Sequence, residues 1–413
     1  MSAATDHLIQ SLYRTEYRKI VSVLCRRFGL QQIEVAEDLA SDTFLIAART
    51  WKEKSVPLHP VPWLLHVAKN LARNYLHRAG LFGLKVLPSL DQETWLPAEA
   101  EIDLSPGNIN DSQLQMMFAV CHPAIPVTAQ IGLSLRILCG FNVEEIAEAF
   151  LTNTETITKR LSRAKARLRE SGFRLEFPEE SEIEVRLSSV LSAIYLLFNE
   201  GYSSACNNAV LRKELCMEAI RLCSMLAENS RTGRPEVFAL LSLMHFHASR
   251  FDARMAEPGQ LILYDQQDVA LWDADLISKG NYYLRCSAAG TKVSRYHLEA
   301  GIGWWHTQQA DTLEKWGHIW ILYQRLLQQE YSPVAALNAV FALSKWKGKQ
   351  LAIAEAAKLK MNGNLQYHIL MGYLYSEDDW SQAAHHYRQA IAMARTDATR
   401  QLLQQKLSKS GGE

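Results

Sequence analysis

A strongly basic segment is the part of this 413-residue sequence that is best suited to bind another molecule. Residues 156–170 contain one acid, Glu170, and six basic residues: Lys159, Arg160, Arg163, Lys165, Arg167 and Arg169. Apolar residues recur here at helical spacing and give the predicted helix one buried face: Ile157, Leu161, Ala164 and Leu168. The outward face and its flanks then carry Glu155, Thr158, Lys159, Ser162 and Arg163. Basic side chains on such a face can bond guanine edges and phosphates in DNA.

The sequence in front of this helix predicts a helix-turn-helix. Residues 142–150 are typical of a short helix that buries Ile146 and Phe150. Thr152 and Glu155 have the spacing of a capping box, which predicts that the second helix begins at Thr152. The ordinary alternative is an amphipathic helix with a solvated basic face. The short helix and the turn before it favour DNA binding over that alternative.

Two polar clusters in the first 80 residues suit other partners. Four polar residues at positions i, i+1, i+4 and i+5 of a predicted helix form an acidic face for a basic partner: Glu37, Asp38, Ser41 and Asp42. The helix after Pro62 mixes cations with an aromatic ring, as single-stranded DNA binding requires: Lys69, Asn70, Arg73, Asn74, Tyr75, His77 and Arg78. Trp63 lies in an apolar run, so we expect it to anchor the core.

The composition is that of a soluble globular protein, with 48% hydrophobic and 21% charged residues and a formal net charge of +0. Apolar residues recur three and four positions apart almost everywhere, so an all-α fold is predicted. No apolar run approaches the roughly 18 residues of a membrane helix, and no export signal begins the chain. We therefore expect a cytoplasmic protein without a membrane partner. The 7 cysteines lack metal-ligand spacing, which predicts reduced thiols and no metal site.

Breaks in the helical pattern divide the chain into three predicted units. Residues 1–80 precede a proline-containing stretch at 81–110 that is typical of a flexible linker, and the helix-turn-helix unit occupies 111–176. An acidic connector follows, and residues 183–413 form a third, helical unit. Within it, residues 365–394 resemble a tetratricopeptide hairpin in the placing of five residues: Gly372, Tyr375, Ala383, Tyr387 and Ala390.

The helix-turn-helix resembles region four of sigma-70-family proteins, which reads the −35 promoter element. Four residue pairs carry this resemblance: Ile146-Ala147, Thr156-Ile157, Arg160-Leu161 and Arg163-Ala164. Residues 36–45, followed by Trp51 and by Pro62-Trp63-Leu64, resemble sigma region two. The sequence departs from the family pattern in both modules. Leu151 replaces a turn glycine, Thr152-Asn153 replaces a more apolar pair, and Asn74 replaces a frequent aspartate.

This resemblance implies a sigma factor of the extracytoplasmic-function type, which directs core RNA polymerase to promoter DNA. It implies that the polymerase is bound by Glu37, Asp38, Ser41 and Asp42. It implies that the opened −10 element is bound by Lys69, Asn70, Arg73, Asn74 and Arg78. It implies that the −35 element is read by Glu155, Thr158, Lys159, Ser162 and Arg163.

The rest of the chain, residues 191–407, resembles the C-terminal extension of one group of these factors, in which it is regulatory. We expect the tethered extension to fold against the first two units, with connector acids competing with DNA for Arg163, Lys165 and Arg167. Stacked helix pairs also offer concave faces, so a small-molecule or protein signal is an expected partner. The first candidates for that site are residues 199–202 and Arg250.

No catalytic residue or cofactor is predicted, because the sequence contains no phosphate-binding loop, nucleophile elbow or zinc-protease motif. Two other functional classes stay open: a stand-alone helix-turn-helix regulator with a helical sensor domain, and a helical scaffold. Residues 36–78 favour the sigma factor, since neither alternative needs a face that binds polymerase.

Overall fold

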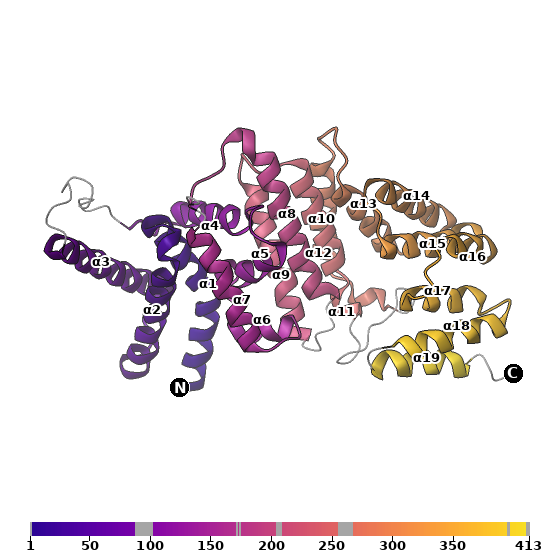
Figure 1. Ribbon diagram of the computed structural model, residues 1–413, viewed down its shortest axis with the longest axis horizontal. Coiled ribbons are helices and arrows are strands. Elements are labelled where there is room, and N and C mark those ends of the chain that lie inside the picture. The colour runs from indigo at the N-terminus through magenta and orange to yellow at the C-terminus, as the bar shows by residue number, and fades with distance from the viewer. Residues whose placement is uncertain are drawn as a thin grey trace. The chain divides into compact units, whose positions relative to one another are not determined.

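The computed structural model describes residues 2–86, 102–170, 172, 175–203, 209–254, 267–394 and 397–409. Every regular element in this part of the chain is helical and none is a strand (Figure 1), which confirms the all-α prediction. Residues 87–101 of the expected linker lie outside the described residues. The described parts of the expected linker are partly helical. One described helix extends to Val86, and another begins at Pro106.

The chain forms two compact units, one of residues 1–206 and 210–232, the other of residues 207–209 and 233–413. The main boundary therefore follows Thr232 and does not coincide with the predicted connector at 177–182. The first part of the expected extension belongs to the same unit as the segments that are expected to bind polymerase and DNA.

Three helices begin the first unit: α1 (Ser2–Phe28), α2 (Ile33–Lys54) and α3 (Pro60–Val86). They pack on one another through apolar stripes, with Tyr17 and Ile20 of α1 fully buried. Trp63 is half-buried and lies with its ring centre 5.4 Å from that of Trp51, so it packs in the core as expected. These contacts fix the helix that carries the expected −10 residues.

The two helices of the helix-turn-helix are α6 (Val143–Ala149) and α7 (Thr154–Glu170). Three elements precede them in the same predicted unit: α4 (Pro106–Val120), α5 (Val127–Leu133) and the π-helical turn η3 (Ser134–Leu138). Asn142 caps α6 in a capping box with Glu145, which satisfies backbone amides at the start of the helix. Gly140 has φ +75°, and a Cβ there would lie 2.9 Å from the carbonyl oxygen of Arg14 in α1. This close approach holds the loop before α6 against the first helix.

Two long helices complete the first unit: α8 (Glu180–Ser203) and α9 (Ala209–Glu228). Helix α8 packs on α4 and α5, and its Arg186 donates a hydrogen bond of 2.9 Å to the carbonyl oxygen of Phe118. The acidic connector contacts Arg231, which follows α9 in the sequence. The Arg231 guanidinium lies 4.3 Å from the centre of the Phe177 ring, and its Nε lies 3.8 Å from a carboxylate oxygen of Glu180. One contact of Glu180 is thus with Arg231, at the end of the unit that carries α9.

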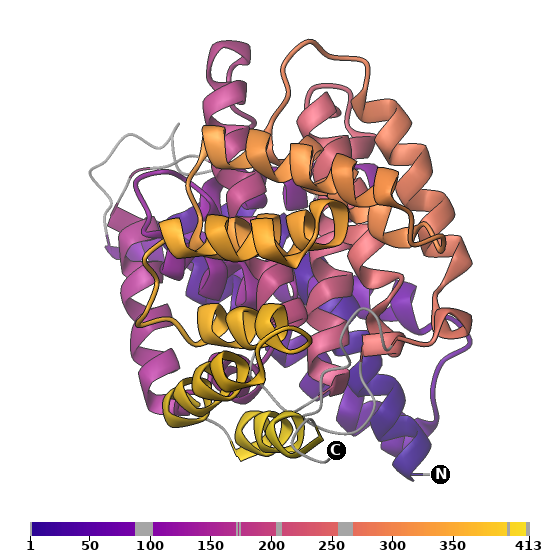
Figure 2. The same cartoon turned by 90° about the vertical axis from the view of Figure 1, so that its right-hand side faces the viewer.

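The second unit continues the helical pattern. Its elements are α10 (Pro235–Ala248), α11 (Phe251–Arg254), η5 (Val269–Leu271), α12 (Ala274–Ser287), α13 (Arg295–Thr307), α14 (Leu313–Gln329), α15 (Pro333–Lys347), α16 (Lys349–Lys358), α17 (Leu365–Tyr375), α18 (Trp380–Met393) and α19 (Asp397–Lys409). From α12 onward each helix packs on the next, which gives the stack seen in Figure 2. Helices α10 and α12 approach closely where the Phe246 ring packs against Gly280. A Cβ on Gly280 would lie 2.6 Å from that ring.

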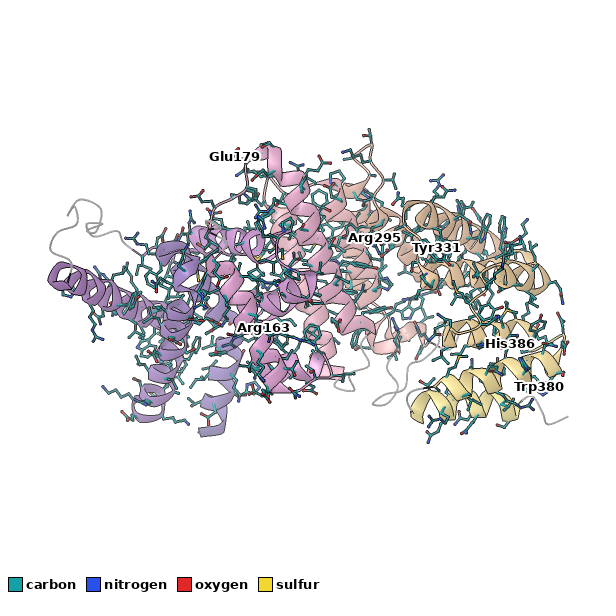
Figure 3. All side chains as sticks on the ribbon, in the orientation of Figure 1. Arg163, Glu179, Arg295, Tyr331, Trp380 and His386 are labelled. Atoms are coloured by element: carbon teal, nitrogen blue, oxygen red, sulfur yellow. The ribbon has the colours of Figure 1, made fainter. Side chains whose placement is uncertain are left out.

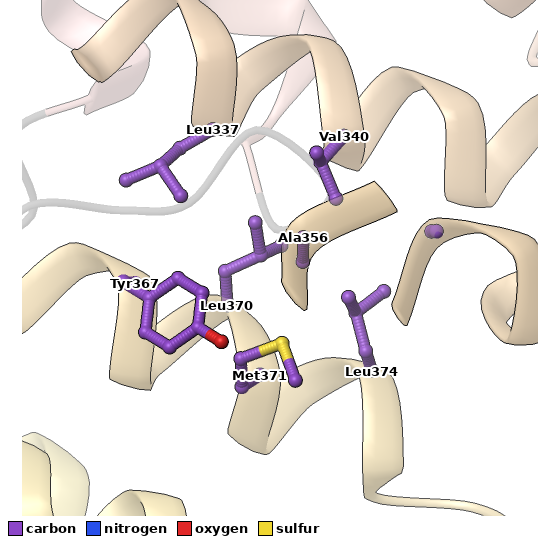
Figure 4. Packing of buried hydrophobic residues seen from close by; sticks show 8 residues of the cluster. Leu337, Val340, Ala356, Tyr367, Leu370, Met371 and Leu374 are labelled. Atoms are coloured by element: carbon purple, nitrogen blue, oxygen red, sulfur yellow. The ribbon is translucent and has the colours of Figure 1, made fainter. Parts of the chain in front are cut away.

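The end of this unit packs through the small residues that the sequence singled out. A Cβ on Gly372 of α17 would lie 2.6 Å from the ring of Tyr387 in α18, and Ala383 and Ala390 are fully buried. Beside this hairpin, apolar side chains of α15, α16 and α17 converge in one core (Figure 4): Leu337, Val340, Ala356, Tyr367, Leu370, Met371 and Leu374. Burial of these side chains stabilises the stack by roughly 1.5–3 kcal/mol for each large residue.

Candidate nucleic-acid and polymerase interfaces

Helix α7 presents the polar face that its sequence predicts. Its apolar seam is buried, with Ile157 and Leu161 at 3% and 6% exposure. All five expected −35 residues are exposed: Glu155, Thr158, Lys159, Ser162 and Arg163. Within this set, Lys159 and Glu155 form an exposed ion pair of 2.6 Å, and Arg163 is labelled on α7 in Figure 3. The helix therefore offers a solvent-accessible face with the donors that base recognition needs.

The turn before α7 differs from the expected capping box. The helix begins at Thr154, and the side chain of Asn153 accepts a 2.8 Å hydrogen bond from the backbone amide of Thr156. Asn153 is thus the cap, and the predicted role of Thr152 is wrong. The cap is at Asn153 and not Thr152 because Thr152 still belongs to the end of α6. Leu151 takes φ +48°, and the Thr152 amide donates a 2.9 Å hydrogen bond to the Ala147 carbonyl oxygen of α6.

Helix α3 carries the expected −10 residues on an accessible side. Asn70, Arg73, Asn74 and Arg78 are exposed, and Lys69 is half-buried. The aromatic residue of this cluster, Tyr75, is oriented by the end of α1 and the turn after it. Its ring lies 5.4 Å from that of Phe28, the last residue of α1, and its hydroxyl donates to the Gln32 side chain, just before α2, at 3.3 Å. Cations and amides are therefore available to a single strand, whereas Tyr75 is partly held by the protein.

The acidic face expected on α2 is divided by the fold. Asp38 and Asp42 are exposed, one turn apart. Ser41 is half-buried and donates its hydroxyl to the Glu37 carbonyl at 2.8 Å. Glu37 is 6% exposed and points into the protein, so the prediction that it shares the outward face is wrong. Apolar packing of α2 sets this direction, because Glu37 lies beside the buried positions Ala36 and Ala40.

The Glu37 carboxylate lies at the centre of a buried polar cluster made by four elements. One oxygen pairs with the Lys165 ammonium of α7. The other lies 3.4 Å from Arg136 Nε of η3 and accepts a hydrogen bond of 3.4 Å from the Tyr17 hydroxyl. Burial and the adjacent Glu37 carboxylate raise the pKa of Tyr17 well above its usual value. We call Tyr17, Glu37, Arg136 and Lys165 the Glu37 cluster.

Comparison with known proteins agrees with this arrangement of segments. Residues 12–81 match the family Sigma-70 region 2, and residues 186–288 match a family of unknown function, DUF6596. The chain is 31% identical over 355 residues to the uncharacterized protein R00370 of Rhizobium meliloti (strain 1021), which covers 84% of this chain and 83% of that protein. No solved structure matches the chain. The chain therefore shares a family with this Rhizobium meliloti protein, and its residues 12–81 are a sigma-70 region 2. This region supports a sigma-factor role in transcription initiation and implies binding to core RNA polymerase.

Further ion pairs join region two to the helix-turn-helix and to α9. Glu34 of α2 pairs with Arg169 of α7 at 2.9 Å. Arg14 of α1 pairs with Glu145 of α6 and, at 2.5 Å, with Glu214 of α9. Long-range pairs of this kind could not be assigned from the sequence, because nothing local relates residues more than 100 positions apart.

A second buried ion pair ties α1 to α9. Arg18 pairs with Glu218 at 2.6 Å, with 7% and 16% of the two side chains exposed. Arg221 contacts the same carboxylate at 2.8 Å and donates to the carbonyl oxygen of Leu138 in η3 at 2.7 Å. Although burial acts to raise it, the guanidinium groups of Arg221 and Arg18 hold the pKa of Glu218 below its usual value. Helix α9 thus contacts both region two and the helix-turn-helix unit.

The two first candidates for a signal site lie in different units of the sigma factor. Residues 199–202 are part of helix α8 rather than a turn, and burial raises the pKa of Glu200. Arg250 is in the second unit, 7% exposed and with its guanidinium 5.9 Å from the ring centre of Trp272.

The described residues contain no group of three or more His, Cys, Asp or Glu side chains that could hold a metal ion. Among the helices described, none is long and apolar enough to cross a membrane.

Proposed function

We propose that this protein is an extracytoplasmic-function sigma factor that is regulated by its own C-terminal extension. In this proposal α7 reads the −35 element through the exposed face of Lys159 and Arg163, and α3 binds the opened −10 element. Asp38, Asp42 and, after opening, Glu37 bind the polymerase. The extension, residues 183–413 with tetratricopeptide-like hairpins, regulates this activity in the cytoplasm and takes a small-molecule or protein signal.

The observation that carries the proposal is the ion pair between Glu37 and Lys165. This contact joins Glu37 of region two to Lys165 of the recognition helix. It buries an acid that is expected to bind polymerase, and it fixes the helix that is expected to read DNA. A buried carboxylate that loses its partner is costly, by about 3–5 kcal/mol. The closed form is therefore stable until polymerase, DNA or a signal supplies replacement contacts.

The contacts of α9 support a regulatory role for the extension. Glu214 and Glu218 of α9 pair with Arg14 and Arg18 of region two, while Arg221 bonds to η3 next to the helix-turn-helix. A change in the position of α9 would alter both modules together. Since α9 also leads into the second unit, it is the element through which that unit can act on the sigma modules.

The proposal is tested by transcription in vitro with purified core RNA polymerase and a library of promoter fragments. We expect the full chain to direct initiation at a subset of fragments and Lys159→Gln to relax the preference at one −35 position, at a cost of roughly 1–3 kcal/mol. Arg49→Gln is the matched control, since Arg49 is exposed on α2 and belongs to neither of the helices proposed to bind DNA. A chain that binds duplex DNA but never supports initiation would instead be a stand-alone helix-turn-helix regulator.

A further inference from the structure

A continuous groove lies between α5 and α7 in the first unit. It consists of two hollows, one of about 210 Å³ and one of about 310 Å³. Both hollows are bordered by Thr128 and Ala129 of α5 and by Arg160 and Ala164 of α7, so they adjoin along these residues. All of these residues belong to one compact unit.

The smaller hollow is apolar. Its walls include Ile146, Phe150, Ile157 and Leu161, which are side chains of the helix-turn-helix core. An apolar cavity of about 150 Å³ is large enough to bind benzene, so this hollow can hold the apolar body of a small molecule. Glu200 of α8 borders the same hollow and is half-buried there.

The larger hollow is cationic. Arg160, Arg163 and Arg167 line it from positions i, i+3 and i+7 of α7. None of these three guanidinium groups forms an ion pair with another residue that the structure describes. Guanidinium groups match carboxylates and phosphates through paired hydrogen bonds, so this end of the groove is suited to an anionic head group.

We propose that the groove binds a small amphipathic anion, with a carboxylate or phosphate head at Arg160, Arg163 and Arg167 and an apolar body beside Ile146 and Leu161. Glu200 determines the orientation, because its carboxylate repels an anion from the apolar end. The bound molecule contacts the recognition helix and α8 at once. An effect of the bound anion on promoter recognition, through Arg163, rests on the proposed function. Binding of the anion to the groove does not.

Calorimetric titration of the full chain without DNA or polymerase tests the binding. The probes are octanoate, octyl phosphate and octan-1-ol, which share an apolar chain and differ in the head group. Loss of charge-assisted hydrogen bonds predicts that octan-1-ol binds about tenfold more weakly than the better of the two anions. The ratio between octanoate and octyl phosphate identifies the preferred head group.

Two variants test the two ends of the groove separately. The exposed pair Arg160→Gln with Arg167→Gln should weaken anion binding about tenfold and leave octan-1-ol unaffected. Gly132→Leu should block all three probes, because Gly132 lines the apolar hollow and its Cβ would meet only Leu161 Cδ2, at 3.6 Å. Arg49→Gln, which removes one arginine charge outside the groove, should bind the probes like the unaltered chain.

Absence of binding by both anions would overturn the proposal, and so would equal binding of octanoate, octyl phosphate and octan-1-ol. Anion binding that Arg49→Gln weakens as much as the two groove variants do would show a non-specific charge effect and would also overturn it. Because Arg160 and Arg167 are exposed, their replacement tests the cationic end even if Gly132→Leu fails to fold.

Discussion

Glu37 shows how the environment of a single residue alters its role. On the sequence it belongs to an acidic run, yet the fold buries it and surrounds it with Lys165, Arg136 and Tyr17. The transfer of a carboxylate out of water is unfavourable unless cations and donors replace the lost hydration. This carboxylate has both, so the Glu37 cluster stabilises the closed arrangement of α2 and α7.

Replacement of Glu37 by Gln should destabilise the first unit by about 2–3 kcal/mol, because Lys165 and Arg136 would be left half-buried without their counter-charge. Glu34→Gln on the same helix is the control. Glu34 also pairs with α7, through Arg169, but both side chains are more than a third exposed, so the loss should be within about 1 kcal/mol. Urea unfolding followed by circular dichroism measures both changes. Equal losses would show that burial of the Glu37 cluster has no special importance.

Leu151 offers a test of local backbone strain. It takes the left-handed conformation at φ +48° with its side chain 64% exposed, so the leucine side chain gains little from burial to offset the strain. We expect Leu151→Gly to stabilise the protein by about 0.5–1 kcal/mol. Leu151→Ala should give a smaller gain because alanine keeps a Cβ. If thermal unfolding shows the same gain for both variants, strain at this position is not the cause.

At the scale of helices, the sequence predicted α7 well and its surroundings poorly. The spacing of Ile157, Leu161 and Leu168 defined the buried seam and the polar face correctly, because helical periodicity is local information. The cap was misplaced by one residue, since Asn153 and Thr152 are both good capping residues and the conformation of Leu151 decides between them. The partner of Lys165 lies 128 residues away, and no local pattern specifies it.

The hairpin of α17 and α18 should respond to acid. His386 Nδ1 lies 2.9 Å from His368 Nδ1, and burial, with His368 and His385, lowers the pKa of His386 to about 4. An unfolded histidine has a pKa of about 6.5, so the unfolded chain binds protons between pH 6.5 and 4 that the folded chain excludes. Stability should therefore be full above pH 6.5 and should fall as pH is lowered towards 4.

Urea midpoints recorded across this pH range measure the effect. His386→Gln should flatten the dependence, because the residue that excludes the proton is removed. His59→Gln, at an exposed histidine of the first unit, should leave it unchanged. If His386→Gln retains the full slope between pH 6.5 and 4, the His368–His386 contact does not cause the dependence.

For the molecule as a whole, the position of α8 and α9 is the feature that the sequence did not predict. The acidic connector suggested a boundary near residue 180, but Leu187, Val190 and Ile194 of α8 are buried within the first unit. A connector marks a change of composition, whereas a domain boundary depends on which apolar faces meet. The match of residues 186–288 to one family also crosses the boundary after Thr232, so that family includes parts of both units.

Truncation tests this boundary. A chain ending at Thr232 should fold cooperatively, because it retains every helix of the first unit. A chain ending at Glu176 should be unstable or aggregate, since α4 and α5 lose the apolar cover of α8. Circular dichroism and analytical ultracentrifugation compare the two. A stable, monomeric chain ending at Glu176 would contradict the boundary.

The most direct test of the closed sigma factor is its equilibrium affinity for core RNA polymerase with and without the contact of Lys165. Lys165→Gln removes the ion pair between α7 and Glu37 but keeps the acids of α2. A larger fraction of molecules should then have α2 and α7 apart, so the apparent affinity for core polymerase should rise about tenfold. Lys159→Gln removes the same charge from the exposed face of the same helix and should leave the affinity unchanged. A polymerase affinity that is unaltered or weakened in Lys165→Gln, in a protein that remains folded, would contradict the account.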